Sequence, residues 1–265
     1  MATMISKNEL LVLCGEGLTA ANDLFERSRN SVREMVGGDD IDSEKIDSQQ
    51  FAVHGFAWMA TYVEALRQSL GWAERLQESG QFGDLEQLFL QLGFGGYLAE
   101  LANGIAMSQI EIVRPTDLGL AEEDIVAFRT EAVRWLIQNG NNQQERDRLS
   151  RMLVNAAGAS EIGELGLDET NAMVRQQFRR FTDDHVSEAA HGWHLRDELI
   201  PMEVVDAMSK MGVFGLTIPE KYGGHGMGKT AMCVVSEELC RGYIGVGSLG
   251  TRSEIAAELI LNGGT

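Results

Sequence analysis

Arg252 is the residue whose side chain is the strongest candidate for binding an anion, because its helical neighbours carry no charge. The residues three and four positions away on its predicted helix are all uncharged: Ser248, Leu249, Ile255 and Ala256. No carboxylate can therefore neutralise this arginine along its own helix. Because a planar guanidinium binds a carboxylate through two parallel hydrogen bonds, the pattern predicts a substrate-binding site for a carboxylate. Ser248 and Thr251 would add hydroxyl groups to it; the alternative is an ordinary ion pair between domains.

Arg241 has the opposite surroundings. Glu237 and Glu238 stand four and three residues before it, one helical turn away. We therefore expect the charge of Arg241 to be neutralised locally. This contrast is what singles out Arg252 as a functional residue.

A glycine fingerprint of dinucleotide-binding proteins occurs at Gly245-Val-Gly-Ser-Leu-Gly250. Its use in binding requires a strand before it, a helix after it and an acidic residue about 20 positions further on. Residues 234–241 have the pattern of a helix instead, and only 15 residues follow Gly250. We therefore predict no Rossmann domain. Close packing of a helix start against a ligand or a neighbouring helix explains the glycines better.

Three histidines lie close together in the sequence, at His185, His191 and His194, near Asp183 and Asp184. His191 and His194 can share a helix face, but nothing in the local pattern brings a third ligand to them. A solvated acidic face explains the group, and no metal site is predicted.

The run Ile218-Pro-Glu-Lys-Tyr-Gly-Gly-His-Gly226 is rich in turn-forming residues. Its glycines allow positive φ angles and close approach of the backbone, so we interpret the run as a structural loop. Tyr222 is expected to pack between helices rather than to line a cleft.

Composition excludes several classes of function. The chain of 265 residues has 22 Lys and Arg against 40 Asp and Glu, a net charge of −18. This charge repels phosphate backbones and anionic lipid, so neither nucleic acid nor membrane is expected as a partner. Three scattered cysteines predict reduced, packed thiols and a cytoplasmic protein. No apolar run approaches the roughly 20 residues of a membrane helix, and no secretory signal is predicted.

Helical periodicity dominates the chain, and the predicted fold class is all-α. Before residue 138, helices are predicted at 51–72, 84–92, about 97–113 and about 120–137. In the first of these the core-facing residues are Phe51, Trp58, Tyr62, Leu66 and Leu70. The third ends before Arg114-Pro115, because proline restricts the residue before it.

The three glycines between residues 158 and 166 predict a junction between two domains. We expect a helical extension at 1–160 and a second helical domain at 165–265. In the second domain, one helical face is predicted to carry Val174, Phe178, Phe181 and His185. The buried stripe of the next helix is predicted to be Ile200, Val204, Met208 and Met211, and a third helix is predicted to carry Ala231, Val235 and Leu239. A last helix carries Ile255 and Leu259.

Three segments of the second domain resemble the N-terminal helical domain of acyl-CoA dehydrogenases. They are the Gly-Val-Phe-Gly step at 212–215, the Ile-Pro-Glu-x-Tyr-Gly-Gly-x-Gly loop at 218–226, and the Glu-Glu-Leu at 237–239. The resemblance covers about residues 170–265. It implies the helical N-terminal domain of a flavin-dependent oxidoreductase that acts on acyl-CoA thioesters.

The helical extension and the run from Gly242 to Glu254 are similar to those of methylsuccinyl-CoA dehydrogenases of the bacterial ethylmalonyl-CoA pathway. This resemblance implies FAD as cofactor, an acyl-CoA substrate, electron-transferring flavoprotein as electron acceptor, and a homo-oligomer. In the implied reaction a glutamate takes the α proton while flavin N5 accepts the β hydride. Members that act on dicarboxylic acyl groups have an arginine in this part of the domain, which supports the role given to Arg252.

Family members continue into a β domain and a second helical domain, which hold FAD and the catalytic base, whereas this chain ends at Thr265. We therefore assign no catalytic, cofactor-binding or metal-binding residue to it and expect the base downstream of residue 265. The chain alone is expected neither to retain FAD nor to oxidise acyl-CoA. Two alternatives remain: a dehydrogenase for monocarboxylic acyl-CoA, with a structural Arg252, and a non-enzymatic helical interaction module formed by residues 1–160.

Overall fold

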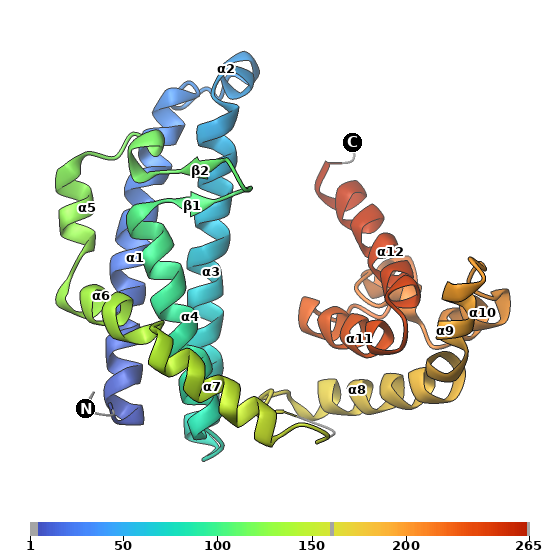
Figure 1. Ribbon diagram of the computed structural model, residues 1–265. Coiled ribbons are helices and arrows are strands. Elements are labelled where there is room, and N and C mark those ends of the chain that lie inside the picture. Colours follow the sequence, from blue (N-terminus) through green and yellow to red (C-terminus); the bar gives the residue numbers. More distant parts are fainter. Residues whose placement is uncertain (1–4, 160–161, 264–265) are drawn as a thin grey trace. The chain divides into compact units, whose positions relative to one another are not determined.

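The computed structural model describes residues 5–159 and 162–263 of the chain. Two compact units are distinguished, a first unit of Met1–Gly166 and a second unit of Leu167–Thr265. Both are built of helices, and the sheet found in the described part has two strands of two residues each. The all-α prediction is confirmed, with this short hairpin as an addition (Figure 1).

Three long helices form the body of the first unit. α1 (Lys7–Met35) and α3 (Gln50–Glu78) are joined through the short α2 (Ser43–Ser48), and α4 (Asp84–Asn103) runs back beside them (Figure 1). Their apolar faces meet in one core, whose members include Leu10, Cys14, Leu66, Phe94 and Leu98.

No prediction covered α1, although its start has a recognisable signal. The Glu9 backbone N–H donates to Ser6 Oγ (3.3 Å), and the Ser6 backbone N–H donates to Glu9 Oε2 (3.0 Å). This reciprocal pair satisfies two N–H groups that lack partners within the helix. Ser-x-x-Glu followed by apolar residues is the pattern that would have predicted the helix.

The face of α3 that reaches the core differs from the predicted one. Leu66 and Leu70 are buried as expected, but Phe51 is 42% exposed and Trp58 and Tyr62 are only half-buried. The residues that face the core are mostly smaller: Ala52, Gly55, Met59, Val63, Leu66, Leu70, Ala73 and Leu76. Small side chains let neighbouring segments approach closely, and the larger aromatic rings lie along the edge of the core.

The bounds of the helices predicted at 84–92 and 97–113 are wrong. The helix α4 continues without a break through residues 93–96, and it ends at Asn103, directly before Gly104. One of its glycines, Gly95, allows a neighbouring segment to pack closely. A Cβ atom on Gly95 would lie 2.6 Å from the backbone N of Asn141 and 2.8 Å from the carbonyl oxygen of Leu136. After α4 the chain forms an antiparallel hairpin, with β1 (Ile105–Ala106) paired to β2 (Ile112–Val113).

Short helices complete the first unit. They are η1 (Pro115–Leu118), α5 (Glu122–Phe128), α6 (Glu131–Trp135), η2 (Leu136–Gly140) and α7 (Gln143–Asn155). The single helix predicted over 120–137 is therefore wrong. In the structure this segment forms two helices, α5 and α6, with a break after Phe128. The break occurs because Thr130 starts a new helix: its hydroxyl oxygen accepts a hydrogen bond from the Val133 N–H (3.3 Å).

The second unit contains the remaining helices. They are α8 (Glu169–Thr182), η3 (Asp183–Ser187), α9 (Glu188–Leu195), α10 (Met202–Lys210), η4 (Val213–Gly215), η5 (Glu220–Tyr222), α11 (Lys229–Gly242) and α12 (Ile244–Gly263). In the stripe predicted for α10, Val204 and Met208 are buried, whereas Ile200 and Met211 are half-buried and lie just outside the helix. Phe178 and Phe181 are buried, but His185, predicted on the same face, is exposed. Ala231, Val235 and Leu239 of α11 are buried, and Ile255 and Leu259 of α12 are exposed.

The three cysteines are free thiols in different environments. Cys14 is fully buried in the core of the first unit, and burial raises the pKa of its thiol well above the ordinary value. Cys233 and Cys240 lie exposed on α11, so the expectation that all three thiols are packed is wrong for these two. In the part of the chain that the structure describes, no helix combines the length and the apolar character needed to cross a bilayer.

Candidate functional site

The glycine run at 245–250 lies in the first turns of α12 and brings that helix close to its neighbours. A Cβ atom on Gly247 would lie 2.9 Å from the backbone N of Cys240, and one on Gly250 would lie 2.7 Å from Val213 Cγ1. The segment before the run is α11, so the strand required for a dinucleotide site is not there. The run is therefore a helix-packing surface, as the sequence interpretation proposed.

Arg252 projects from α12 as an exposed side chain. Within residues 5–159 and 162–263, no hydrogen bond or ion pair involving Arg252 is found. Ser248 is one helical turn before it, on the same face. Thr251 lies about 100° around the helix from Arg252, at the border of the packed side.

The two hydroxyl groups already have backbone partners. Ser248 Oγ donates to the carbonyl oxygen of Gly245, and Thr251 Oγ1 donates to that of Ser248, both at 2.9 Å. Both side chains are half-buried. To donate to a ligand carboxylate, each hydroxyl would have to rotate away from its carbonyl oxygen. Of the three predicted site residues, Arg252 is thus the one whose polar group has no hydrogen-bond partner in the described part of the chain.

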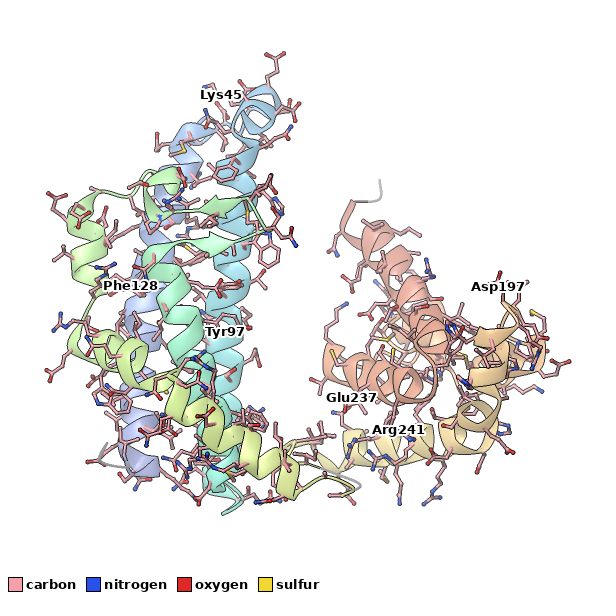
Figure 2. The ribbon with its side chains drawn as sticks, viewed as in Figure 1. Lys45, Tyr97, Phe128, Asp197, Glu237 and Arg241 are labelled. Carbon is pink, nitrogen blue, oxygen red and sulfur yellow. The ribbon has the colours of Figure 1, made fainter. Side chains whose placement is uncertain are left out.

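Arg241 lies on α11 (Figure 2). Its charge is neutralised locally, as predicted. Its Nε lies 3.0 Å from Glu238 Oε2, and its Nη2 lies 2.7 Å from Asp183 Oδ1. Of the two predicted partners, Glu238 takes this role, whereas Glu237 is exposed. The hydrogen bond to Asp183 raises the pKa of Arg241, and the one to Glu238 adds to the effect.

Glu238 was predicted as a partner of Arg241, but its burial and its two further arginine partners were not. Its side chain is 1% exposed and lies 3.0 Å from Arg175 Nε and from Arg179 Nη2. Burial alone would raise its pKa, but hydrogen bonds from Arg179 and Arg241 and the nearby charge of Arg175 outweigh burial and hold the pKa below its ordinary value. The four charged groups join α8 to α11, the helix that leads into α12.

The glycine loop at 218–226 is structural. Its backbone is closed by hydrogen bonds from the Gly226 N–H to the Ile218 carbonyl and from the Met227 N–H to the Leu216 carbonyl, both at 2.9 Å. Gly223 and Gly226 have φ angles of 83° and 61°, which glycine adopts without strain. The expectation that Tyr222 packs between helices is wrong. Its side chain is 66% exposed, because the turn at Gly223 directs it outward, and Lys221 Nζ lies 4.7 Å from its ring centroid.

The histidine group has other contacts. The His185 ring packs against Phe181, with centroids 5.0 Å apart, and Asp183 is held by Arg241. Among the residues the structure describes, no three His, Cys, Asp or Glu side chains are grouped as a metal ion would require.

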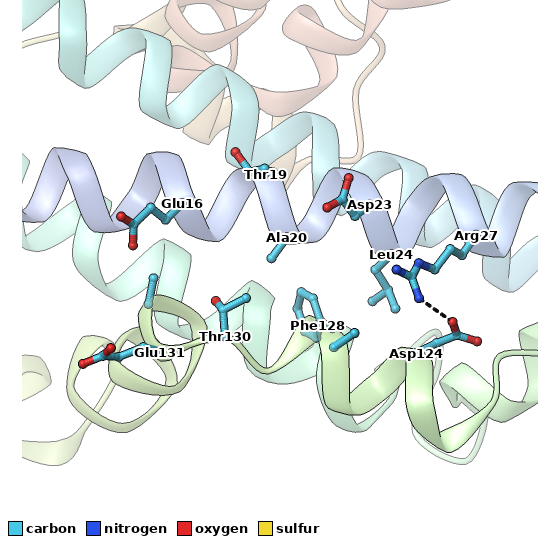
Figure 3. A pocket seen from close by; sticks show the side chains of 12 residues that line it. Glu16, Thr19, Ala20, Asp23, Leu24, Arg27, Asp124, Phe128, Thr130 and Glu131 are labelled. Carbon is cyan, nitrogen blue, oxygen red and sulfur yellow. Dashed lines mark hydrogen bonds and ion pairs between the residues drawn. The ribbon is translucent and has the colours of Figure 1, made fainter.

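A cavity of about 420 Å³ opens in the first unit between α1 and the α5–α6 segment (Figure 3). Leu24 and Phe128 are among its apolar lining residues, and Arg27 lies at one end, hydrogen-bonded to Asp124 (2.6 Å). The lining also carries the carboxylates of Glu16, Asp23 and Glu131. Their negative charge repels a ligand with several phosphate groups, so this cavity is a poor candidate for a coenzyme A ester.

Comparisons with known proteins give one match to the second unit and one to nearly the whole chain. Residues 168–265 match the family described as acyl-CoA dehydrogenase, N-terminal domain. The (2S)-methylsuccinyl-CoA dehydrogenase of Cereibacter sphaeroides is 53% identical over 258 residues, which is 97% of this chain and 46% of that protein. The resemblance predicted for the second unit is confirmed. The chain spans about half the length of this relative.

Two other relatives align over shorter stretches. Glutaryl-CoA dehydrogenase of Desulfococcus multivorans is 33% identical over 81 residues, which is 30% of this chain and 21% of that protein. Mitochondrial isovaleryl-CoA dehydrogenase of Pongo abelii is 32% identical over 101 residues, 37% of this chain and 24% of that protein.

Proposed function

We propose that the chain, whose residues 168–265 match the acyl-CoA dehydrogenase N-terminal domain family, is the N-terminal part of a dehydrogenase for (2S)-methylsuccinyl-CoA. One observation carries this proposal. The methylsuccinyl-CoA dehydrogenase aligns with 97% of the chain, whereas the glutaryl-CoA and isovaleryl-CoA dehydrogenases align with 30% and 37%. The helical extension thus accompanies the domain in the relative named for methylsuccinyl-CoA.

The complete enzyme would remove hydrogen from the α and β carbons of the acyl thioester. FAD, when bound, supplies the acceptor for the β hydride, and a carboxylate base takes the α proton. The side chains that α12 offers, a guanidinium and two hydroxyls, suit a carboxylate ligand and do not define a site for a flavin ring. We therefore assign neither FAD nor the base to residues of this chain.

The family resemblance supports further proposals for the complete enzyme. Electron-transferring flavoprotein would accept the electrons, and the enzyme would be a cytoplasmic homo-oligomer of the ethylmalonyl-CoA pathway. A dehydrogenase for monocarboxylic acyl-CoA is the alternative within the same family, and Arg252 distinguishes the two.

We assign to Arg252 the binding of the free carboxylate of the acyl group, with Ser248 and Thr251 as hydroxyl neighbours. Support comes from the contrast between two arginines of the same unit. Arg241 has carboxylates at 3.0 Å and 2.7 Å, whereas the exposed guanidinium of Arg252 is not engaged by a carboxylate in the described part of the chain. An arginine that lacks a protein counter-ion is suited to a ligand that brings one.

The test is the substitution Arg252→Met in the complete enzyme. Loss of a charged hydrogen-bond pair costs about 2–3 kcal/mol, so kcat/KM for methylsuccinyl-CoA should fall roughly a hundredfold. For an uncharged acyl-CoA of the same length, kcat/KM should change by less than about threefold. Arg180→Met, at another exposed arginine of the second unit, is the matched control.

Equal losses on the charged and uncharged substrates would make Arg252 structural and favour the monocarboxylic alternative. Flavin absorbance tests the enzyme class separately. The complete protein should be yellow and reduce an electron-accepting dye with acyl-CoA, whereas the 265-residue chain should do neither. A colourless complete protein would favour a helical interaction module instead.

A further inference from the structure

The segment just before the second unit is hydrogen-bonded to the long helices of the first unit through the backbone of Glu164. Trp72 Nε1 on α3 donates a hydrogen bond to the Glu164 carbonyl oxygen (3.1 Å). The Glu164 backbone N–H donates to Glu86 Oε1 on α4 (2.8 Å). Both polar groups of the Glu164 peptide backbone are thereby held by side chains of the long helices. Gln81 Nε2 also lies 3.4 Å from the Glu164 carboxylate.

Glu86 depends on this arrangement for a hydrogen-bond partner. It lies in the first turn of α4 and is 5% exposed. A buried carboxylate is costly unless it accepts hydrogen bonds, and the Glu164 N–H provides one. The position at the N-terminus of a helix further favours its negative charge. Release of residue 164 would leave this carboxylate oxygen without that donor.

One glycine before Glu164 and one after it allow this segment to lie close to α3 and α4. Gly163 and Gly166 have φ angles of 76° and 63°. A Cβ atom on Gly163 would lie 3.1 Å from Glu86 Oε1, and one on Gly166 would lie 3.2 Å from Leu76 Cδ2 and 3.3 Å from Trp72 Cδ1. Any other residue at Gly166 would combine a strained backbone with a crowded side chain.

We propose that residues 162–166 are a clasp that holds the linker against α3 and α4, so that the second unit departs from Gly166. Without the clasp, the second unit would be tethered from Asn155, the last residue of α7. The freed segment would lengthen the tether by up to roughly 35 Å when extended. The clasp therefore limits the length of the tether between the two units. This proposal does not depend on the proposed enzymatic function.

The experiment measures hydrogen exchange of the Glu164 amide in the full 265-residue chain. Glu86→Leu with Trp72→Phe removes the acceptor and the indole donor while keeping apolar bulk. We expect Glu164 to exchange at least tenfold faster in this double variant, and small-angle scattering to give a larger maximum dimension. Glu86→Gln retains an acceptor oxygen and is the control, with Glu164 still protected.

Amide exchange in α1 shows whether the first unit remains folded in each variant. If the double variant unfolds this unit, Gly166→Ala tests the clasp without altering a core side chain. It should expose the Glu164 amide while the amides of α1 stay protected. The proposal is overturned if Glu164 exchanges at an unprotected rate in the unaltered chain. It is also overturned if variants with a folded first unit leave both Glu164 exchange and the maximum dimension unchanged.

Discussion

At the scale of single residues, Glu238 has the environment that most constrains the second unit. Its carboxylate is 1% exposed and is held by Arg175, Arg179 and Arg241. Glu238→Gln would leave three arginines facing a neutral amide. We expect the second unit to lose roughly 2–4 kcal/mol of stability at pH 7, because breaking a buried charge network leaves partly buried charges uncompensated. Hydrogen exchange of α8 and α11 amides measures the loss.

The pH dependence of that loss follows from the direction of the pKa shift. The folded-state pKa of Glu238 is lowered, so its contribution is fully present above the unfolded pKa of about 4.3 and disappears as pH falls through the folded pKa. The difference between the unaltered chain and Glu238→Gln should therefore shrink below about pH 4. Glu237→Gln, at the exposed neighbour, is the control and should change stability by less than about 0.5 kcal/mol. A difference that stays constant down to pH 3 would contradict the assignment.

Some of these residue roles could be read from the sequence and some could not. The contrast between Arg241 and Arg252 was predictable because helical neighbours are fixed by spacing alone. The arginines that reach Glu238 from α8 were not predictable, because Arg179 is 59 residues away in sequence. Nothing in the local pattern shows that α8 and α11 pack together. The exposure of Tyr222 depends likewise on the turn at Gly223, whose direction the sequence does not fix.

At the scale of helices, the glycines of α4 have opposite surroundings. Gly95 faces the backbone of residues 136–141, whereas Gly93 has no atom within 4 Å of its Cβ position. Alanine favours a helix over glycine by about 1 kcal/mol. We therefore expect Gly93→Ala to stabilise the first unit slightly. Gly95→Ala should destabilise it by roughly 1–3 kcal/mol, since backbone atoms at 2.6–2.9 Å must move apart.

Urea unfolding followed by tryptophan fluorescence distinguishes the two variants, because three of the four tryptophans, Trp58, Trp72 and Trp135, lie in the first unit. Trp193 of the second unit contributes equally in both variants. The midpoint should rise for Gly93→Ala and fall for Gly95→Ala. If Gly95→Ala raised the midpoint as well, close packing of η2 against α4 would not be the reason for glycine there.

The same glycines explain where helix prediction failed. Three glycines within four residues, Gly93, Gly95 and Gly96, indicate a helix break in the sequence. The single helix α4 was therefore predicted as two helices. A glycine that ends a helix and a glycine that admits a neighbouring backbone look alike until the neighbour is known. Burial of Val204 and Met208 on α10 was predicted correctly because spacing alone determines which residues share a helix face.

At the scale of the whole molecule, the end of α12 is apolar around much of its circumference. The consecutive residues Leu259, Ile260 and Leu261 are 70%, 73% and 56% exposed. A helix that is apolar on all sides is normally buried. The methylsuccinyl-CoA dehydrogenase of Cereibacter sphaeroides extends well beyond the aligned region, which makes up 46% of its length. We expect this helix end to be covered in the complete protein and to promote self-association of the isolated chain.

Leu259→Lys combined with Ile260→Lys should therefore reduce self-association of the 265-residue chain, as measured by sedimentation velocity over a range of concentrations. Val126→Lys removes a separate exposed apolar side chain, 62% exposed on α5, and is the control. It should leave the sedimentation profile unchanged. Equal effects of both changes would point to net charge, and not to the α12 end, as the cause.

The full burial of Cys14 makes the first unit resistant to alkylation. Thiolate is the form that reacts with a maleimide, and at Cys14 both access and ionisation are suppressed. Cys233 is open to reagent, and Cys240 is exposed but has a pKa raised by partial burial. A native chain thus takes up label on α11 alone. The appearance of a third labelled thiol reports the opening of the helical extension, without any engineered probe.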